Sequence, residues 1–207
     1  YQIIGKIWTR KLDNAIKRMD ALVVLTERDA EKWKKIKKAT VIPNSLPFYP
    51  EASSTCETKK IISVGRLDEQ KGYDMLIDAW ETVHKQHPDW KIIIYGNGEL
   101  HDILKYAIIQ KHLEDSFILH EPVKDIMNQY LDSSIYVMSS RFEGFGMVLA
   151  EAMACGVPCI SFDCPYGPSD IIKDFVDGLM VENGNVVQLA QKISELIEQE
   201  AIRKRMG

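Results

Sequence analysis

Short apolar runs alternate with amphipathic stretches along most of this chain. Buried strands are predicted in five mainly apolar runs, KIISVG, WKIIIYG, SFIL, SIYVMSS and VPCISF. Helical spacing or capping residues between these runs predict helices over about 73–87 and from about residues 100, 125, 146, 169 and 186. Strands separated by single helices are typical of right-handed βαβ units. We therefore predict an α/β fold with a doubly wound, Rossmann-like parallel sheet.

The first part of the chain follows a less regular pattern. Apolar residues at helical spacing predict a helix over 7–19, and the run ALVVL predicts a buried strand over 21–25. Thr26, with Asp29 three residues later, predicts the capped start of a second helix that reaches about Lys38.

A polar, turn-prone stretch separates this part from the rest of the chain. The segment YPEASSTCETKK, residues 49–60, follows the proline-containing passage TVIPNSLPF. Clusters of such residues between periodic segments are typical of connections. We therefore predict two domains, residues 1–48 and residues 49–207.

The composition excludes several classes of protein. With 207 residues, 45% of them apolar and 27% charged, the chain has an ordinary globular composition. No apolar run approaches the roughly 18 residues that span a bilayer, and no signal peptide is recognisable, so a cytoplasmic location is expected. The four cysteines form no CxxC pair and have no nearby histidine, which predicts reduced, mostly buried thiols and no zinc site.

Charge is distributed unevenly along the chain. Residues 1–47 carry eleven Lys or Arg against five Asp or Glu, within a net charge of −4 for the whole chain. Such a basic front is typical of proteins that meet an anionic membrane surface or a phosphate-bearing acceptor, and also of helices with solvated lysine faces. Nucleic acid is not an expected partner, because the basic residues lack interleaved aromatics and no recognised binding motif is present.

The loops after the predicted strands form the expected ligand-binding face, because ligands bind outside the carboxyl ends of the strands in doubly wound sheets. One of them, IYGNGEL, resembles the start of a dinucleotide fingerprint. His101 occupies the third glycine position, however, so a tight turn from strand to helix is the better interpretation. A phosphate-binding sequence of the form GxxxxGKS or GxxxxGKT is absent, which argues against a P-loop enzyme.

The segment VGRLDEQKG places Arg66 and Lys71 on a loop between a buried strand and a helix. Two cations beside the free amide groups of a helix N-terminus form a good anion site, and phosphate is the expected target. The same cations are equally consistent with surface residues that form ion pairs with Asp68 and Glu69. The segment alone leaves both interpretations open.

A second loop carries two carboxylates eight residues apart, Glu143 and Glu151. Gly144 and Gly146 let the backbone approach a ligand closely, just before a predicted helix. Carboxylates accept hydrogen bonds from pairs of sugar hydroxyls, so a nucleotide sugar would suit two glutamates and two cations. Alternatively, Glu143 caps the helix and Glu151 lies on its solvated face.

Two other chemistries fit these residues less well. A glycosidase also uses a pair of carboxylates, but it does not usually combine them with cations placed for a diphosphate. The sequence DxD is absent, so a carboxylate-held metal ion has no evident ligands. Arg66 and Lys71 would then stabilise the departing diphosphate themselves.

Four segments, taken in order, resemble a known family. VGRLDEQKG, IYGNGEL, SSRFEGFGMVLAEAMACGVPCI and DGLMVE together are similar to the retaining glycosyltransferases of family 4, which have the GT-B fold. Glu143 and Glu151 match the family's E-x7-E motif. The resemblance covers essentially the whole chain. It implies the C-terminal, donor-binding half of a GT-B fold, preceded at residues 1–48 by the end of the N-terminal acceptor domain and its hinge.

The resemblance implies transfer of a hexosyl group from a nucleotide-diphosphate sugar, by default a UDP-sugar, to an acceptor hydroxyl with retention of configuration. Arg66, Lys71 and Glu143 take the catalytic roles, with both cations on the donor diphosphate, and Glu151 binds the ribose hydroxyls. The remaining donor contacts are expected at Val123, near the base, and at Gly144, Phe145, Gly146, Met147 and Val148. No cofactor and no metal ion is expected.

The stretch CPYGPSDII is similar to family members that build cell-surface polysaccharides. This implies polysaccharide or glycolipid synthesis. If the basic front belongs to a membrane-associated first domain, a sugar or lipid-linked acceptor and peripheral association with the inner face of the cell membrane are expected. Most of the first domain and the usual final helix are expected to be missing, so the chain should bind donor with little or no transfer. The alternatives are a nucleotide-binding or regulatory domain without chemistry, and a related epimerase or phosphorylase.

Overall fold

The computed structural model describes residues 11–207, and the chain divides into two compact units after Ser45. This division falls three residues before the predicted one. The polar stretch 49–60, predicted as a boundary, lies within the second unit. There the Ser54 backbone N–H donates to the Cys155 carbonyl at 2.7 Å. Residues 49–59 form no helix or strand, as the polar, turn-prone pattern predicts, and most of them are exposed.

The first unit contains two short parallel strands among its described residues. β1 (Val23–Val24) pairs with β2 (Thr40–Val41), so the strand is shorter than the predicted 21–25. Residues 11–18 are helical, and the earlier part of the predicted helix 7–19 lies outside the described residues. Across residues 11–207, no helix is both long and apolar enough to cross a membrane.

The helix α2 (Glu27–Trp33) begins where the capping pattern predicts. The Thr26 hydroxyl oxygen accepts a hydrogen bond from the Asp29 backbone N–H at 3.1 Å, which satisfies one of the free donors at the helix start. The helix ends at Trp33 and not at the predicted Lys38, and residues 34–36 form a turn. The lysine-rich stretch beyond Trp33 offers few apolar residues that would anchor a further helical turn.

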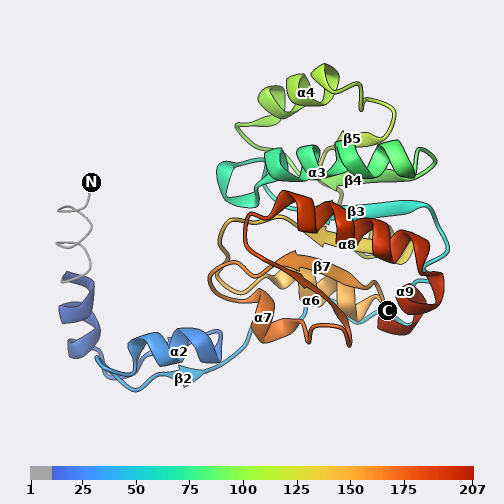
Figure 1. The fold of residues 1–207 in the computed structure, drawn as a ribbon. Coiled ribbons are helices and arrows are strands. Elements are labelled where there is room, and N and C mark those ends of the chain that lie inside the picture. Colours follow the sequence, from blue (N-terminus) through green and yellow to red (C-terminus); the bar gives the residue numbers. More distant parts are fainter. Residues whose placement is uncertain (1–10) are drawn as a thin grey trace. The chain divides into compact units, whose positions relative to one another are not determined.

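The second unit is built on a six-stranded sheet in which every pairing is parallel. Its strands are β3 (Lys60–Val64), β4 (Lys91–Tyr95), β5 (Phe117–His120), β6 (Ile135–Met138), β7 (Cys159–Phe162) and β8 (Gly178–Val181). Their order is β5-β4-β3-β6-β7-β8, which confirms the predicted doubly wound sheet (Figure 1). The strand β8 was not predicted, because its apolar run is only four residues long and begins with a glycine.

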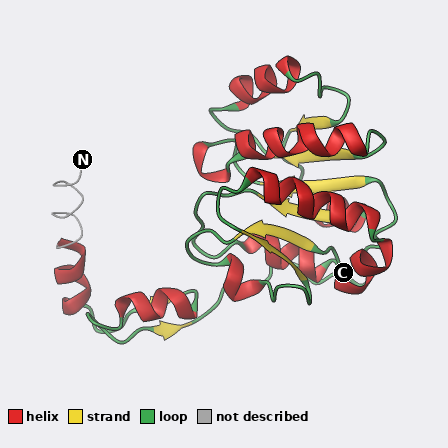
Figure 2. Cartoon of the chain, in the orientation of Figure 1, coloured by secondary structure: helices red, strands yellow, loops and turns green. Residues whose placement is uncertain are grey.

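Helices cover both faces of this sheet (Figure 2). They are α3 (Tyr73–Gln86), α4 (His101–Gln110), α5 (Ile126–Leu131), α6 (Met147–Ala154), α7 (Pro168–Ile171), α8 (Val186–Glu198) and α9 (Glu200–Met206), with a short 3₁₀ helix η1 (Glu69–Lys71). Neighbouring strand residues point to opposite faces, so Ile61 joins one hydrophobic core and Ile62 the other. The first core contains residues of α3, α4 and α8, and the second contains residues of α5 and α6.

The end of the described chain packs against the start of the second unit. Arg203 of α9 is buried, and its Nε donates to the Cys56 carbonyl at 2.9 Å. Its guanidinium also donates to the carbonyl oxygens of Leu196 and Ile197 and lies 5.2 Å from the centre of the Trp90 ring. These bonds satisfy free carbonyl groups at the end of α8, and they tie α9 to the first residues of the unit.

The strand order reverses between β3 and β6, and this reversal fixes where a ligand can bind. From β3 the chain moves toward β4 on one side, and from β6 it moves toward β7 on the other. In doubly wound sheets, ligands bind at this point, outside the carboxyl ends of the strands, so a ligand is expected at the loops that follow β3 and β6. The predicted site segments, 65–72 and 139–146, are these two loops.

The glycines of IYGNGEL have a structural role. A Cβ atom on Gly96 would collide with the carbonyl of Gly65, and one on Gly98 would collide with the carbonyl of Leu67. The two loops are also joined by backbone hydrogen bonds, such as the 2.8 Å bond from the Leu67 N–H to the Asn97 carbonyl. The prediction of a tight turn from strand to helix is confirmed, and the glycines allow the close approach of the loop after β3.

Candidate functional site

A buried ion pair lies at the reversal of strand order. The Lys71 Nζ is 2.7 Å from the Glu143 Oε1, and the Ser140 hydroxyl donates to the same oxygen at 2.7 Å. The side chains of Lys71 and Glu143 are only 14% and 8% exposed. Lys71 comes from the loop after β3 and Glu143 from the loop after β6, so the pair joins the two loops.

The short helix η1 sets the position of Lys71. Its start is capped by Asp68, whose Oδ1 accepts a hydrogen bond from the Lys71 backbone N–H at 3.2 Å. It ends at Gly72, which has a φ of +63° and no room for a Cβ beside the Ser139 carbonyl. Only glycine fits this position without strain, so the turn brings Lys71 against the loop after β6.

Hydrogen bonds join the two loops over several residues. The Arg141 N–H donates to the Gln70 carbonyl at 2.8 Å, and the Gln70 side chain donates to the Phe142 carbonyl at 3.0 Å. The Ser139 hydroxyl donates to the Lys71 carbonyl at 2.9 Å. These hydrogen bonds hold the two loops together, so the positions of Lys71 and Glu143 are fixed before a ligand binds.

A second ion pair fastens the loop after β6 to α3. The Arg141 guanidinium donates to both carboxylate oxygens of Asp74, at 2.9 and 2.6 Å. The hydrogen bond from Arg141 holds the pKa of the Asp74 carboxyl below its ordinary value, and the Asp74 carboxylate raises the pKa of Arg141. The charged form of Asp74 is therefore favoured by folding.

Replacement of Asp74 by asparagine should make this contribution visible as a pH dependence. A carboxyl whose pKa falls on folding stabilises the protein above its unfolded pKa, and this stabilisation is lost as the pH falls through the folded pKa. At neutral pH we expect Asp74→Asn to cost about 0.5 kcal/mol, a small value because the Asp74 side chain is 55% exposed. Urea unfolding of both proteins should show this difference shrinking as the pH falls below the ordinary Asp value of 3.8. A pH-independent difference would contradict the assignment.

The two predicted cations differ in their surroundings. Arg66 is 74% exposed, and its guanidinium lies 3.2 Å from the Asp68 carboxylate, as in the surface interpretation. Lys71 pairs with neither Asp68 nor Glu69 through its side chain but with Glu143, which the surface interpretation did not include. The structure therefore brings Lys71 and Glu143 into contact, and it leaves Arg66 at the exposed edge of its loop.

The loop from Glu143 to Gly146 leads directly into α6. Gly146, with a φ of +89°, precedes the first helical residue and provides no side-chain cap for the helix. The carboxylate of Glu143 contacts Lys71 and Ser140, so the alternative in which Glu143 caps this helix is wrong. A Cβ on Gly144 would meet no protein atom within 4 Å. The space beside Gly144 is thus open. No side chain caps α6, and the N–H of Leu149 in its first turn donates to the Gly146 carbonyl at 2.9 Å.

A third loop, residues 163–167, packs against the glutamate loop, residues 143–146. The Glu143 N–H donates to the Pro165 carbonyl at 3.1 Å. Gly167, with a φ of +100°, packs so closely on the Phe145 carbonyl that a Cβ would collide with it. The predicted site residues did not include Ser140, Pro165 or Gly167, although Ser140 ends one predicted strand run and the other two lie within five residues of the end of another, at the ligand-binding edge.

Glu151 lies one helical turn into α6 and is half-buried. Its Oε2 accepts a hydrogen bond from the Tyr130 hydroxyl at 3.0 Å. The alternative of a freely solvated Glu151 is therefore wrong. Val123, in the loop after β5, is also half-buried and packs against the core cluster that contains Tyr130. Phe145, Met147 and Val148 are half-buried at the start of α6.

The cysteines are unpaired and buried, as predicted. Burial raises the pKa of Cys155 to about 11 and that of Cys164 to about 12, so both remain thiols at neutral pH. Within residues 11–207, no group of three or more His, Cys, Asp or Glu side chains is arranged so that it could hold a metal ion.

Comparison with known proteins matches residues 50–207 to a family model described as glycosyl transferases group 1. The amylovoran biosynthesis glycosyltransferase AmsD of Erwinia amylovora is 36% identical over 91% of this chain. The poly(ribitol-phosphate) alpha-N-acetylglucosaminyltransferase of Staphylococcus aureus is 30% identical over 95% of it. This chain spans 55% and 40% of the lengths of these two relatives.

Solved structures share the fold. A crystal structure of a variant of S. aureus TarM in complex with fondaparinux, alpha-GlcNAc-glycerol and UDP superposes with a TM-score of 0.88 and 27% identity. The match covers 96% of this chain and 41% of that one. A structure of HepE from Anabaena in complex with UDP and glucose superposes with a TM-score of 0.83 at 21% identity, which shows the fold alone. The second unit therefore has the Rossmann-like architecture of one half of a GT-B glycosyltransferase.

Proposed function

Because this chain belongs to the glycosyl transferases of group 1, we propose that it is the donor-binding, C-terminal part of a retaining glycosyltransferase of family 4. The whole enzyme transfers a hexosyl group from a UDP-sugar to an acceptor hydroxyl and retains the anomeric configuration. It acts in the synthesis of a cell-surface polysaccharide or glycolipid. The names of the relatives from E. amylovora and S. aureus support this class of product, and the UDP bound to TarM supports the donor.

The Lys71–Glu143 pair at the reversal of strand order is the observation that carries this proposal. A cation and a carboxylate lie together beside an open glycine and an uncapped helix start, at the reversal of strand order where doubly wound sheets bind ligands. A ligand with a diphosphate next to a sugar matches this arrangement. The phosphates meet Lys71 and the N–H groups of α6, and the sugar hydroxyls meet Glu143.

Each group has a role in the proposed reaction. Lys71 and the exposed Arg66 bind the diphosphate and stabilise its charge as the bond to the sugar breaks. The departing diphosphate takes the proton of the acceptor hydroxyl, through a short-lived ion pair. Glu143 orients the sugar and is not itself a nucleophile, and Glu151 accepts hydrogen bonds from the ribose hydroxyls. The protein cations supply the positive charge, and no metal ion or cofactor takes part.

Calorimetric titration with UDP, GDP and ADP tests this function, followed by the matching sugar nucleotides, in the presence of a chelator. We expect binding of UDP and tighter binding of a UDP-sugar. Equal affinity for UDP and every UDP-sugar would favour the second candidate function, a nucleotide-binding or regulatory domain without chemistry. Absence of binding to every nucleotide would contradict the proposal.

Replacement of Gly144 by alanine should separate donor binding from folding. The added methyl group meets no protein atom, so the free energy of unfolding should change little. A donor that lies against this backbone would be displaced, and we expect its affinity to fall about tenfold, which corresponds to about 1.4 kcal/mol. Thermal unfolding and titration with a UDP-sugar measure the two effects. Unchanged affinity would show that the donor does not contact Gly144.

The acceptor is a sugar or a lipid-linked sugar that the rest of the enzyme binds, at the inner face of the cell membrane. The excess of lysine and arginine in residues 1–47 supports an anionic surface or a phosphate-bearing acceptor. Sedimentation of the full-length enzyme with vesicles tests the membrane part. We expect more enzyme in the pellet with anionic vesicles than with neutral ones, and equal amounts would contradict it.

A further inference from the structure

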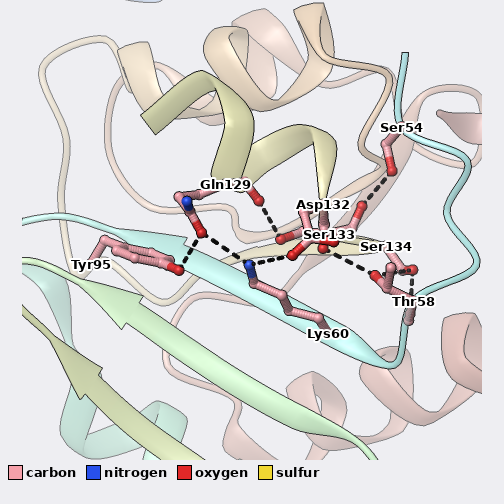
Figure 3. Close-up of polar contacts among 8 residues, drawn as sticks. All are labelled: Ser54, Thr58, Lys60, Tyr95, Gln129, Asp132, Ser133 and Ser134. Carbon is pink, nitrogen blue, oxygen red and sulfur yellow. Dashed lines mark hydrogen bonds and ion pairs between the residues drawn. The ribbon is translucent and has the colours of Figure 1, made fainter. Parts of the chain in front are cut away.

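The helix α5 lies over the sheet beside α6, and a polar network fixes its C-terminal end (Figure 3). Lys60 Nζ, at the start of β3, donates to Gln129 Oε1 and to Asp132 Oδ2, both at 3.2 Å. The Tyr95 hydroxyl, at the end of β4, donates to the same Gln129 oxygen at 2.6 Å. The Lys60 side chain is only 13% exposed, so this cation is held between α5 and the sheet.

The segment before β3 adds further bonds to the same end of α5. The Ser54 hydroxyl donates to the Ser133 carbonyl at 2.6 Å, and the Thr58 hydroxyl donates to the Asp132 carbonyl at 3.1 Å. These bonds satisfy carbonyl groups just beyond the last turn of the helix. The rotation and the position of α5 on the sheet are therefore fixed, and so is the direction of Tyr130, the residue after Gln129.

Tyr130 is fully buried, and its hydroxyl reaches Glu151 of α6. Its ring centre lies 6.5 Å from that of Phe48 and 6.0 Å from that of Tyr136, both at tilted angles. Burial, followed by the nearby charges of Tyr136 and Glu151, raises the pKa of Tyr130 well above its ordinary value. The hydroxyl thus keeps its proton and donates to Glu151 Oε2 at 3.0 Å.

We propose that Tyr130 is a positioning residue for recognition of the ribose of the donor. It holds Glu151 Oε2 in place and leaves Oε1 to accept the 2′-hydroxyl of the nucleotide. A glutamate side chain has three rotatable bonds, and fixing one oxygen lowers the entropy that ribose binding must otherwise remove. This inference rests on the proposed function, in which Glu151 contacts the ribose.

The test measures the ratio of the affinity for UDP to the affinity for 2′-deoxy-UDP. Loss of a positioning contact and loss of structure affect this ratio differently. Damage to the fold lowers both affinities by the same factor and leaves the ratio unchanged. Loss of the Tyr130–Glu151 bond lowers the affinity for UDP more. We expect Tyr130→Phe to reduce the ratio about fivefold, the effect of one ordinary hydrogen bond. Glu151→Ala should bring the ratio close to one.

Tyr136→Phe is the matched control. The Tyr136 hydroxyl is also buried, next to Tyr130, and hydrogen-bonds no side chain among the described residues. Its removal should leave the ratio of the two affinities unchanged. In the double variant Tyr130→Phe/Glu151→Ala, the ratio should be no smaller than in Glu151→Ala alone, because Tyr130 acts only through Glu151.

The outcomes separate the inference from the proposed function. A ratio that is unchanged in Tyr130→Phe but lost in Glu151→Ala would overturn the role of Tyr130 and leave the proposed function intact. No preference for UDP over 2′-deoxy-UDP in the unmodified protein would overturn the ribose assignment of Glu151, and with it this inference. If neither nucleotide binds, the proposed function itself fails and the inference fails with it.

Discussion

Lys71→Ala will weaken binding of the nucleoside diphosphate and will also lower the stability of the fold. The lost cation should weaken binding by about 1.5 to 3 kcal/mol, the usual effect of a charge-assisted hydrogen bond. Removal of Lys71 also leaves the Glu143 carboxylate, 8% exposed, without its cationic partner. An unpaired, nearly buried carboxylate should cost about 2 to 4 kcal/mol of unfolding free energy. Titration with UDP and urea unfolding measure the two losses.

A double variant separates these two effects. In Lys71→Ala/Glu143→Gln the residue at 143 is neutral, so most of the lost stability should return while nucleotide binding stays weak. Lys111→Ala is a suitable control cation, because Lys111 also contacts two carboxylates, Asp78 at 3.0 Å and Glu81 at 2.6 Å, but is 30% exposed. Lys111→Ala should lower the free energy of unfolding by less than about 1 kcal/mol and leave UDP binding unchanged. UDP affinity that recovers with stability in the double variant would sink the phosphate assignment of Lys71.

Gly167→Ala is expected to have the second largest effect. The methyl group would collide with the Phe145 carbonyl, and the φ of +100° is one that alanine rarely adopts. Strain and collision together should cost about 3 kcal/mol and push the glutamate loop away from its position. Because this loop carries Glu143, donor affinity should also fall. At a temperature where Gly167→Ala is still folded, this fall should exceed what the lost stability alone explains.

Gly184 provides the matched control for this variant. It also has a positive φ, of +79°, but a Cβ there would meet no atom within 4 Å. Gly184→Ala should therefore cost only the backbone strain, about 1 kcal/mol, and leave donor binding unchanged. If thermal unfolding shows equal losses for Gly167→Ala and Gly184→Ala, the third loop does not brace the site.

Most of the second unit could be predicted from the sequence because its strands are short apolar runs of a fully buried parallel sheet. The period of apolar residues also placed the start of α3 at Tyr73. The elements that were missed are those with weak local signals. β8 has four residues and begins at Gly178, and η1 has only three, with its start fixed by the Asp68 side chain.

The contacts of the site were less predictable than its residues. Lys71 and Glu143 are 72 positions apart, and the nearest carboxylates along the chain, Asp68 and Glu69, were the obvious partners for a cation. Only the order of the strands shows that the loops after β3 and β6 face each other. Tyr130 gave no signal either, because a tyrosine on a short helix is ordinary core composition and its contact with Glu151 depends on how α5 and α6 pack.

The bond between Arg203 and Cys56 has a consequence for how the protein is made. The two residues are 147 positions apart, so the first segment of the second unit finds this partner only when nearly the whole unit has left the ribosome. The central strand β3 emerges early, but its neighbour β6 and the helix α9 follow much later. Because β4 and β5 follow β3 directly in the chain and extend the sheet on one side of it, the edge of β3 that later pairs with β6 stays unpaired until β6 emerges, and such unpaired strand edges favour aggregation.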